Sequence, residues 1–489
     1  MDQPQQSARV AWKILFTTSL SVVLVFINSS GLSIALPNLA RDLDASASET
    51  MWVLLSYMLS TTTLILVFGR VTDIIGRRRL YILGIVLFMI ATLACGLATD
   101  PVFLIVMRFV QGIGAAAIIT NTTALLTDVF PSRILSSALG INASIAAVGQ
   151  VLGPLLGGVV TELFDWRWIF LGGIPISLLG LVWSLRLIPK QGPRVSGERM
   201  DYPGSVLSVL GIALFVIAVS WGGSLGWGDP LVVGSFVAAV LVVIAFVALQ
   251  RRKVHPLIDV ALFKDRFVSS LYIGAFVNSI SNYAIVLLAS LYLQGVRGFS
   301  AIDVGLMILP VPIGTMVAAA VAGRLARTFS ARWLTASGMV LLGVGALLLA
   351  VRLAVDTPYI AIAVPLALVG VGVGIFMTPN TTALMSRVPA TRRGIANAIR
   401  STLQNAGYLF STALALAIAT GGLTAAQQLA AYKGTLFGMQ SGDLAAFVSG
   451  VQAALVLFGV LALVGAVVSV VGTRPGPLAV PAPKPAPEL

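Results

Sequence analysis

The sequence predicts an all-α polytopic membrane protein with fourteen transmembrane helices, and three observations lead to this prediction. The chain of 489 residues is 58% hydrophobic and 10% charged, and its mean hydropathy is +0.98. The apolar residues fall into long runs, and the lysines and arginines gather in alternate loops between those runs. A soluble globule could not bury this much apolar surface, so most of it must face lipid.

Fourteen apolar runs come close to the roughly 20 residues that a helix needs to cross a bilayer. The first run follows a polar N-terminus and is longer than the core of a signal peptide, so we interpret it as an uncleaved span. The predicted spans are residues 14–36, 53–68, 80–98, 102–127, 135–160, 168–188, 205–222, 231–249, 269–292, 303–322, 335–353, 359–385, 395–419 and 446–471.

The net charge of +13 does not indicate nucleic-acid binding, because the basic residues do not share one face. With a cytoplasmic N-terminus, nearly all of them fall in cytoplasmic loops. The five on the outer side are Arg41, Arg167, Arg297, Arg352 and Lys433. This is the positive-inside pattern. An even number of spans places both termini in the cytoplasm. The excess of arginine over lysine suggests a GC-rich bacterial source, and we expect the protein in the inner (cytoplasmic) membrane of a bacterium.

No group of residues in the sequence is suited to catalysis. The chain has one histidine and one cysteine, Cys95, and no acidic pair lies within the predicted spans. Such residues offer neither a metal site nor a nucleophile with its base, and no G-x-x-x-x-G-K phosphate loop is present. We therefore expect no enzyme and no cofactor, with transport energy drawn from an ion gradient or from the substrate's own gradient.

The loop from Gly69 to Arg79, between the second and third spans, carries four arginines and one aspartate. It resembles the signature loop of the major facilitator superfamily, G-x-x-x-D-x-x-G-R followed by two basic residues. The resemblance implies a cytoplasmic gate between two moving bundles, in which Asp128 could pair with Arg70 or Arg77. The residues that we assign to this gating loop are Gly69, Arg70, Asp73, Gly76, Arg77, Arg78 and Asp128.

The two halves of the chain repeat each other. The segment 121–125 recurs at 380–384, and the Gly-Arg pair at 69–70 recurs at 323–324. Spans one to six therefore match spans nine to fourteen, with spans seven and eight as an inserted pair. In the second copy of the loop, Arg327 stands where the first has Asp73. The superfamily has this parallel repeat, with its substrate site near the midplane between the halves.

The repeat divides the chain into five segments. We expect a cytoplasmic N-terminus, an N-terminal six-helix bundle, a linker with two inserted transmembrane helices, a C-terminal six-helix bundle and a disordered cytoplasmic tail. In that order they are residues 1–13, 14–188, 189–268, 269–471 and 472–489.

The fifth span contains glycines four residues apart, together with a proline. Glycines at this spacing give a flat face on which another helix can pack closely, and the proline removes a backbone hydrogen bond. The run resembles the motif by which antiporters of the superfamily are recognised, and it favours export. The motif residues are Gly149, Gly153, Pro154, Gly157 and Gly158.

Polar residues at helical spacing indicate a central aqueous cavity, with hydrogen bonding between helices as the alternative. The thirteenth span has the clearest polar stripe. Arg108 lies on the order of 10 Å inside the fourth span, where it marks a pathway or an ion pair unless it snorkels. We assign to the substrate or proton pathway Asn28, Tyr57, Arg108, Gln111, Asn121, Asn278, Asn282, Asn380, Asn397, Arg400, Gln404 and Tyr408.

The first two spans resemble those of the fourteen-helix drug:proton antiporters. Aligned on Ala35-Leu36-Pro37, the aspartate that this family carries in span one falls on Asn28. None of the eighteen acids lies deep in a predicted span, although exporters of cations use such an acid so that proton and drug compete for it. We therefore expect a monomeric, proton-coupled exporter of neutral, zwitterionic or anionic amphiphiles. The alternative is an uptake symporter or uniporter for a neutral or anionic metabolite.

Overall fold

The computed structural model describes residues 3–189, 200–253, 257–258, 263–326, 328–388, 393–439 and 441–472. The part of the linker at 190–199 and the predicted tail beyond Gly472 lie outside these residues. Over the described ranges the protein is helical, without β-strands. Its α-helices are α1 (Gln3–Asp42), α2 (Ala47–Ile75), α3 (Arg77–Gly96), α4 (Pro101–Val129), α5 (Ser132–Leu163), α6 (Trp168–Leu171), α7 (Ile174–Leu187), α8 (Tyr202–Leu225), α9 (Pro230–Arg252), α10 (Arg266–Gly295), α11 (Ala301–Met307), α12 (Pro310–Leu325), α13 (Ala331–Arg352), α14 (Tyr359–Arg387), α15 (Arg393–Thr420), α16 (Ala425–Lys433) and α17 (Ser441–Gly472).

Every predicted span coincides with a helix or a broken pair of helices. The sixth span is shared by α6 and α7, and the tenth by α11 and α12. Within the described chain, twelve helical segments are long and apolar enough to cross a membrane. The fifth and thirteenth predicted spans are not among those twelve, and they correspond to α5 and α15, of 32 and 28 residues.

Local sequence signals set several helix boundaries. The Ser46 side chain accepts a hydrogen bond from the Glu49 N–H while Glu49 reaches back to Ser46, and this capping box starts α2. Asp100 caps α4, and Pro101 occupies its first turn. Gly76 has a φ of 94°, a conformation that strains other residues, and it separates α2 from α3. Gly76 of the gating loop therefore makes the tight turn between these two helices.

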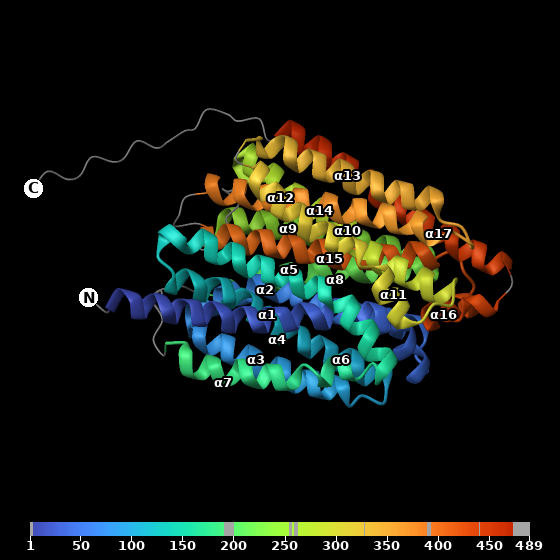
Figure 1. The fold of residues 1–489 in the computed structure, drawn as a ribbon, viewed down its shortest axis with the longest axis horizontal. Coiled ribbons are helices and arrows are strands. Elements are labelled where there is room, and N and C mark those ends of the chain that lie inside the picture. Colours follow the sequence, from blue (N-terminus) through green and yellow to red (C-terminus); the bar gives the residue numbers. More distant parts are fainter. Residues whose placement is uncertain are drawn as a thin grey trace, which may run out of the picture.

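The helices form two bundles with the same packing pattern, which we call the first half (α1–α7) and the second half (α10–α17). In the first half α1 packs on α5, and α4 packs on both α2 and α3. In the second half α10 packs on α15, and α14 packs on both α12 and α13. Figure 1 shows the first half, in blue to green, below the second half, in yellow to red. The predicted fold of two six-helix bundles in parallel repeat is confirmed.

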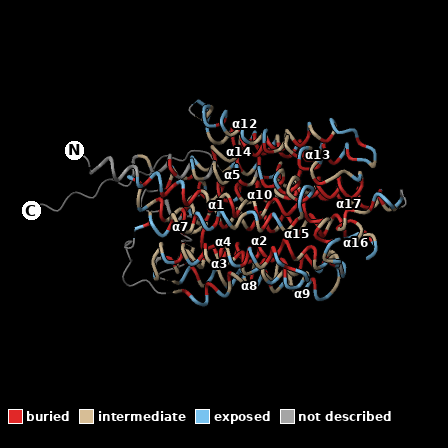
Figure 2. Tube along the Cα trace, turned by 60° about the horizontal axis from the view of Figure 1, so that its bottom comes forward, coloured by how far each residue is buried: buried red, intermediate tan, exposed pale blue. Residues whose placement is uncertain are grey.

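The two halves meet along two seams, α2 against α15 and α5 against α11. The inserted helices pack mainly against one of these seams. Helix α8 packs on both α15 and α2, with Phe215 and Phe410 rings 4.1 Å apart, whereas α9 packs mainly on α8. Figure 2 shows exposed residues along α8 and α9 at the rim of the bundle. The inserted pair therefore covers the α2–α15 seam.

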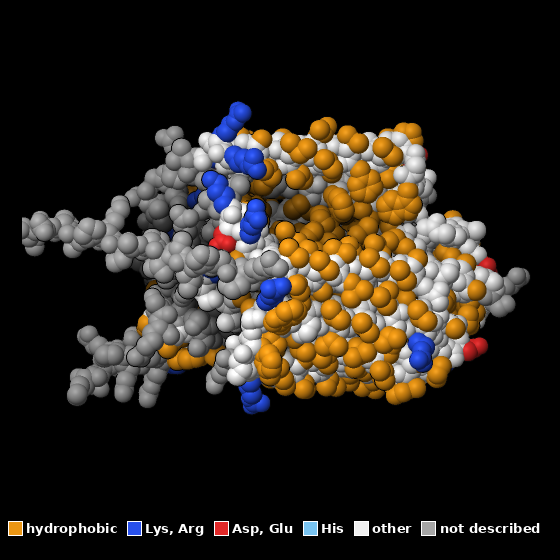
Figure 3. Space-filling model, turned by 90° about the horizontal axis from the view of Figure 1, so that it is seen from above, with side chains coloured by type: hydrophobic (Ala, Val, Ile, Leu, Met, Phe, Trp, Pro, Cys, Tyr) orange, Lys and Arg blue, Asp and Glu red, His pale blue; other side chains and the backbone are white. Residues whose placement is uncertain are grey.

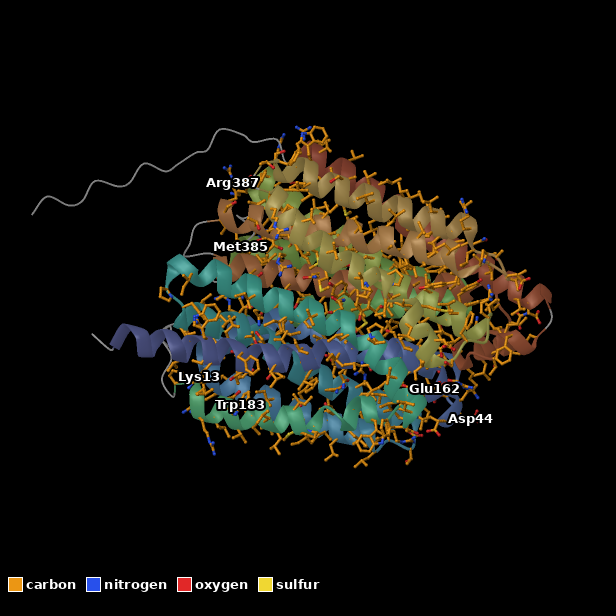
Figure 4. The ribbon with its side chains drawn as sticks, viewed as in Figure 1. Lys13, Asp44, Glu162, Trp183, Met385 and Arg387 are labelled. Carbon is orange, nitrogen blue, oxygen red and sulfur yellow. The ribbon has the colours of Figure 1, made fainter. Side chains whose placement is uncertain are left out.

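The two ends of the bundle differ in charge. Lys13 and Arg387 lie at the end where α1 begins and α17 ends, whereas Asp44 and Glu162 lie at the opposite end (Figure 4). On the face shown in Figure 3, most lysines and arginines gather at one end, and hydrophobic side chains cover the length beyond it. We call these the basic end and the far end.

Gly149, Gly153 and Gly157 form the face of α5 that packs on α1, whereas Gly158 faces α11. A Cβ added at Gly157 would lie 2.3 Å from the carbonyl oxygen of Gly31, and one at Gly153 would lie 1.9 Å from the Ser30 hydroxyl. Such distances leave no room for a side chain unless a helix moves. The predicted close-packing role of this motif therefore matches the contact between α1 and α5.

A polar clasp joins the start of α8 to the end of α9. The Asp201 carboxylate accepts hydrogen bonds from the Gly204 N–H at 3.1 Å and from Gln250 Nε2 at 2.8 Å, and it lies 3.1 Å from Lys253 Nζ. Burial alone would raise the pKa of Asp201, but the bonds from Gln250 and Gly204 and the Lys253 charge together lower it below its usual 3.8.

Substituting Gly157 with alanine should destabilise the protein by about 1–3 kcal/mol, because the backbone of α1 must shift to admit the new methyl group. Gly234→Ala on α9 is the matched control, since a Cβ there meets nothing within 4 Å. Thermal unfolding in detergent should show a midpoint several degrees lower for Gly157→Ala and no loss for Gly234→Ala. Equal midpoints would show that the α1–α5 contact is looser than the structure has it.

The clasp also makes stability depend on pH. A carboxylate whose pKa is lower in the folded state stabilises that state above its unfolded pKa, and the contribution disappears as the pH falls through the folded value. The unfolding midpoint should therefore fall as the pH drops below about 4. In Asp201→Asn this acid-dependent decrease should be smaller. An identical pH profile for the variant would mean that the clasp does not stabilise the α8–α9 pair.

Candidate functional site

Arg108 lies inside the first half, in a network of neutral partners. Its side chain is only 1% exposed. Nη1 donates to Asn28 Oδ1 at 3.0 Å and to Gln111 Oε1 at 2.7 Å, and Nε donates to the Val53 carbonyl at 3.3 Å. The guanidinium carbon also lies 4.2 Å from the centre of the Tyr57 ring. Three helices, α1, α2 and α4, are thereby held around one buried positive charge.

Asn28 occupies the position of a counterion without carrying a charge. Its Oδ1 accepts from both Arg108 and Gln111, at 3.0 and 3.1 Å, and its Nδ2 donates to the Ile169 carbonyl at 3.3 Å. Gln111 in turn donates to the Thr92 hydroxyl at 2.7 Å. Among the residues that the structure describes, no acid forms an ion pair with Arg108. Hydrogen bonds and the tyrosine face satisfy the guanidinium, but its charge stays uncompensated.

A cavity lies between the two halves, and two stacked tyrosines divide it. The larger part, which we call the first chamber, has a volume of about 100 Å³, more than the roughly 10–15 Å³ that one water needs. It is lined by Ser30, Ser33, Gln150, Pro154, Asn282, Tyr283, Val286, Leu287, Ile308, Val311, Pro312, Thr315, Val373, Met377 and Tyr408. The second chamber is lined by Val25, Phe26, Ser29, Tyr57, Met58, Thr61, Thr62, Ile119, Tyr283, Asn405 and Tyr408.

Three residues assigned to the pathway from sequence line these chambers: Tyr57, Asn282 and Tyr408. Arg108 is in neither lining, because the Tyr57 ring lies between its guanidinium and the second chamber. Sequence reasoning missed Gln150 and Tyr283. Both had a signal in the sequence, since Gln150 interrupts the glycine motif of α5 and Tyr283 directly follows Asn282.

The polar stripe of α15 forms a connected track that starts at the cavity. Tyr408 receives a hydrogen bond from Gln404 Nε2 at 2.6 Å, and Gln404 Oε1 accepts from Arg400 Nη1 at 2.9 Å. Arg400 Nε donates to Asn397 Oδ1 at 3.2 Å. Asn397 then reaches Thr123 of the first half at 3.4 Å. The track therefore carries a second guanidinium with neutral partners, on the side of the cavity toward the basic end.

The remaining predicted pathway residues bond to neighbouring helices and do not line the chambers. Asn121 accepts from the Thr72 hydroxyl at 3.0 Å, and Asn380 donates to the Leu271 carbonyl at 3.1 Å. Asn278 Nδ2 on α10 donates to the Met339 sulfur on α13 at 3.4 Å. These contacts fit the alternative of hydrogen bonding between helices, and a transport role for the three asparagines stays a prediction.

The gating loop is bound to its own half. Arg77 pairs with Asp128 and donates to the Ala124 carbonyl at 2.7 Å, and Arg78 donates to the Leu185 carbonyl at 2.9 Å. The Asp73 side chain and Arg327, which we expected to distinguish the two copies of the loop, lie outside the described residues.

The far end is closed by contacts between the halves that the sequence did not indicate. Gln294 Nε2 on α10 donates to the Ile34 carbonyl on α1 at 2.9 Å. Lys433 at the end of α16 pairs with Asp44, between α1 and α2, and its hydrogen bond and charge lower the pKa of Asp44. Gly434, at a φ of 64°, lies against Pro37. We call these contacts the far-end latch.

Comparison with known proteins identifies a family. The sequence profile of the Major Facilitator Superfamily matches residues 18–412 and, in a second match, residues 271–488. Puromycin resistance protein pur8 of Streptomyces alboniger is 33% identical over 420 residues, which are 85% of this chain and 83% of the relative. The uncharacterized transporter YebQ of Escherichia coli K12 is 31% identical over 404 residues, 82% of this chain and 87% of the relative.

A third relative, multidrug resistance protein Stp of Mycobacterium tuberculosis H37Rv, is 31% identical over 394 residues, 80% of this chain and 73% of the relative. Among solved structures, a bacterial homolog of the human lysosomal transporter Spinster in an inward-facing, unoccupied conformation superposes with a TM-score of 0.65. The two chains are 16% identical, and the match covers 95% of this chain and 97% of the other. This likeness shows the fold.

The placement of the chambers can be tested by thiol labelling, because Cys95 is the only cysteine and is fully buried. A cysteine at Asn282, in the first chamber, should react with a small methanethiosulfonate reagent at least about tenfold faster than one at Ser281. Ser281 is the matched control, since it is the preceding residue of α10 and is fully buried. Equal labelling rates would show that Asn282 does not face the cavity.

Proposed function

The chain belongs to the Major Facilitator Superfamily of membrane transporters, and we propose that it exports small neutral, zwitterionic or anionic amphiphiles by alternating access, in exchange for protons. The observation that carries this proposal is the contact between Arg108 and Asn28. It leaves a permanent positive charge beside the cavity, with no buried acid to offset it within the described chain. Export is supported by the relatives named for puromycin and multidrug resistance and by the glycine motif of α5.

The charge of the cavity supports the exclusion of cations. No described residue in the lining of either chamber is charged. The guanidinium of Arg108 lies against the lining residue Tyr57, and that of Arg400 is connected to Tyr408 through Gln404. Two like charges about 8 Å apart repel by about 2 kcal/mol at an effective dielectric of about 20, which lowers affinity by more than tenfold. An anionic group would instead gain from Arg400, which lies on the polar track that begins at Tyr408.

Alternating access requires contacts that break at one end while others form at the opposite end. At the far end, the latch joins the halves through Gln294, Lys433 and Gly434. Toward the basic end, Asn397 contacts Thr123 across the halves. We propose that the far-end latch opens toward the outside of the cell and that the basic end faces the cytoplasm, as the positive-inside rule requires. Both termini then lie in the cytoplasm of a bacterial cell, and the protein acts as a monomer.

The coupling proton needs a group that titrates. Arg108 cannot lose its proton under physiological conditions, and Asn28 has none to exchange. Of the acids that we considered from sequence, Asp303 shares a hydrogen bond with Ser300 at 2.9 Å at the start of α11. Asp303, Glu162, Asp73 or the substrate itself would carry the proton, and we propose that coupling takes one of these routes.

The direction of transport separates export from uptake of a metabolite on the same fold. In inverted vesicles with an imposed pH gradient, an exporter accumulates its substrate and dissipates the gradient. In whole cells, an uptake system accumulates the substrate and an exporter lowers its level. Accumulation by expressing cells but not by inverted vesicles would overturn the export proposal.

Replacing Asn28 with aspartate should admit cations. The new carboxylate would replace Asn28 Oδ1, which is 3.0 Å from Arg108 Nη1, and would form an ion pair that neutralises the buried charge. We expect uptake of a cationic dye by inverted vesicles to rise by about tenfold or more, in line with the repulsion that is removed.

Asn28→Ser is the matched control, because it removes the amide without adding charge. It should leave cation transport at the wild-type level. If Asn28→Asp folds, as judged by its thermal midpoint, and still transports no more cation than Asn28→Ser, the charge of Arg108 does not select the substrate.

A further inference from the structure

A stacked pair of tyrosines separates the two chambers. The rings of Tyr283 on α10 and Tyr408 on α15 have centroids 4.4 Å apart and planes inclined by 27°. Both residues line both chambers. The pair therefore forms a partition between the chambers, which we call the septum.

The two rings are held with different strength. Tyr408 receives a short hydrogen bond of 2.6 Å from Gln404, which is itself bound to Arg400. Tyr283 is bound through its hydroxyl to Ser29 of α1 at 3.3 Å, a longer and weaker contact. Ser29 belongs to the opposite half, so relative motion of the halves strains the bond that holds Tyr283, whereas the bond from Gln404 to Tyr408 stays within α15.

The chambers on either side of the septum have similar chemistry. The first combines neutral hydrogen-bonding groups such as Gln150 and Asn282 with an apolar wall that includes Val286 and Met377. The second chamber is smaller, with a volume of about 20 Å³, and its lining includes Tyr57 and Met58. Neither volume alone holds a molecule of several rings, but displacement of one septum ring would join them into a single site.

We propose that the septum is a binding element for planar aromatic substrates, in which the Tyr283 ring turns aside and a substrate ring takes its place on the face of Tyr408. The inference rests on the proposed transport function and specifies the class of its substrates. The ligand would be an uncharged aromatic compound with a hydroxyl or amide group, which Gln150 or Asn282 can bind. Tyr408 is the fixed stacking surface, and Tyr283 determines whether a ring is admitted.

Stacking explains why an aromatic ring is preferred to an aliphatic body of the same size. Offset or tilted aromatic pairs attract each other beyond the effect of the area that they bury. A substrate ring that replaces Tyr283 restores the contact that the septum loses on opening, whereas a saturated ring does not. The Ser29 bond is the contact that opening must break, so its removal should favour binding.

The test is direct binding to the purified full-length protein in detergent, measured by equilibrium dialysis. The probes are 2-naphthol and its saturated analogue decahydro-2-naphthol, which share the hydroxyl and the bicyclic outline. Wild type should bind the naphthol about 2–10-fold more tightly. Ser29→Ala should bind it more tightly than wild type. Equal affinity of wild type for the two probes would overturn the proposal.

Variants at the septum separate stacking from general packing. Tyr408→Phe keeps a stacking face, and it should retain the preference for the aromatic probe. Tyr408→Leu keeps apolar bulk but not the ring, and it should lose the preference while still binding both probes. Tyr292→Phe is a control on α10, since that tyrosine bonds to the Ala354 carbonyl and lies outside both chambers. A preference that survives Tyr408→Leu would overturn the proposal. If the leucine variant does not fold, Tyr408→Phe serves as the test, and loss of the aromatic preference in that variant would overturn the proposal.

This binding assay is independent of transport direction and of proton coupling. If the aromatic preference follows the septum variants but vesicles show no export, the proposed function fails and the septum site stands. If export is found without any aromatic preference in binding, the septum site fails and the proposed function stands.

Discussion

The guanidinium of Arg108 organises the first half, because five helices supply its immediate surroundings. Val53 and Tyr57 come from α2, Asn28 from α1 and Gln111 from α4, while Thr92 of α3 and Ile169 of α6 bind the amides that hold the arginine. Breaking a buried charge away from its partners is strongly unfavourable, so this network keeps the wall of the cavity rigid. Because the amide of Asn28 is neutral, the same contact that fixes the structure leaves the positive charge of Arg108 without a paired acid among the described residues.

The two halves have the same internal packing, but the two seams between them are packed differently. Helix α8 covers the α2–α15 seam, and the glycine face of α5 brings its neighbour α11 close at the other seam, where a Cβ on Gly158 would lie 2.4 Å from the Ala301 carbonyl. The far-end latch adds polar contacts that relative motion can break without moving a helix within its own half. The packing between the two bundles is thus less extensive than the packing within each of them, and the divided cavity lies at this interface.

Much of this could be predicted from sequence, because hydropathy, repeats and motifs act locally. The spans follow from the apolar runs, and the inserted pair follows from the internal repeat. The septum and the latch could not be predicted, because Tyr283, Gln294 and Lys433 acquire their roles only through contacts between distant helices. Periodicity shows which face of a helix is polar, but not which side chain of another helix covers that face. It therefore could not predict that Tyr57 separates Arg108 from the second chamber.

We propose that the charges of Arg108 and Arg400, which have neutral partners among the described residues, select the substrate. The most direct measurement is transport by wild-type protein in proteoliposomes of three compounds that share one aromatic body and carry an ammonium, a hydroxyl or a carboxylate group. We expect the hydroxyl and carboxylate compounds to be transported and the ammonium compound to be slower by about tenfold or more. Transport of the ammonium compound at the rate of the other two, or faster, would contradict it.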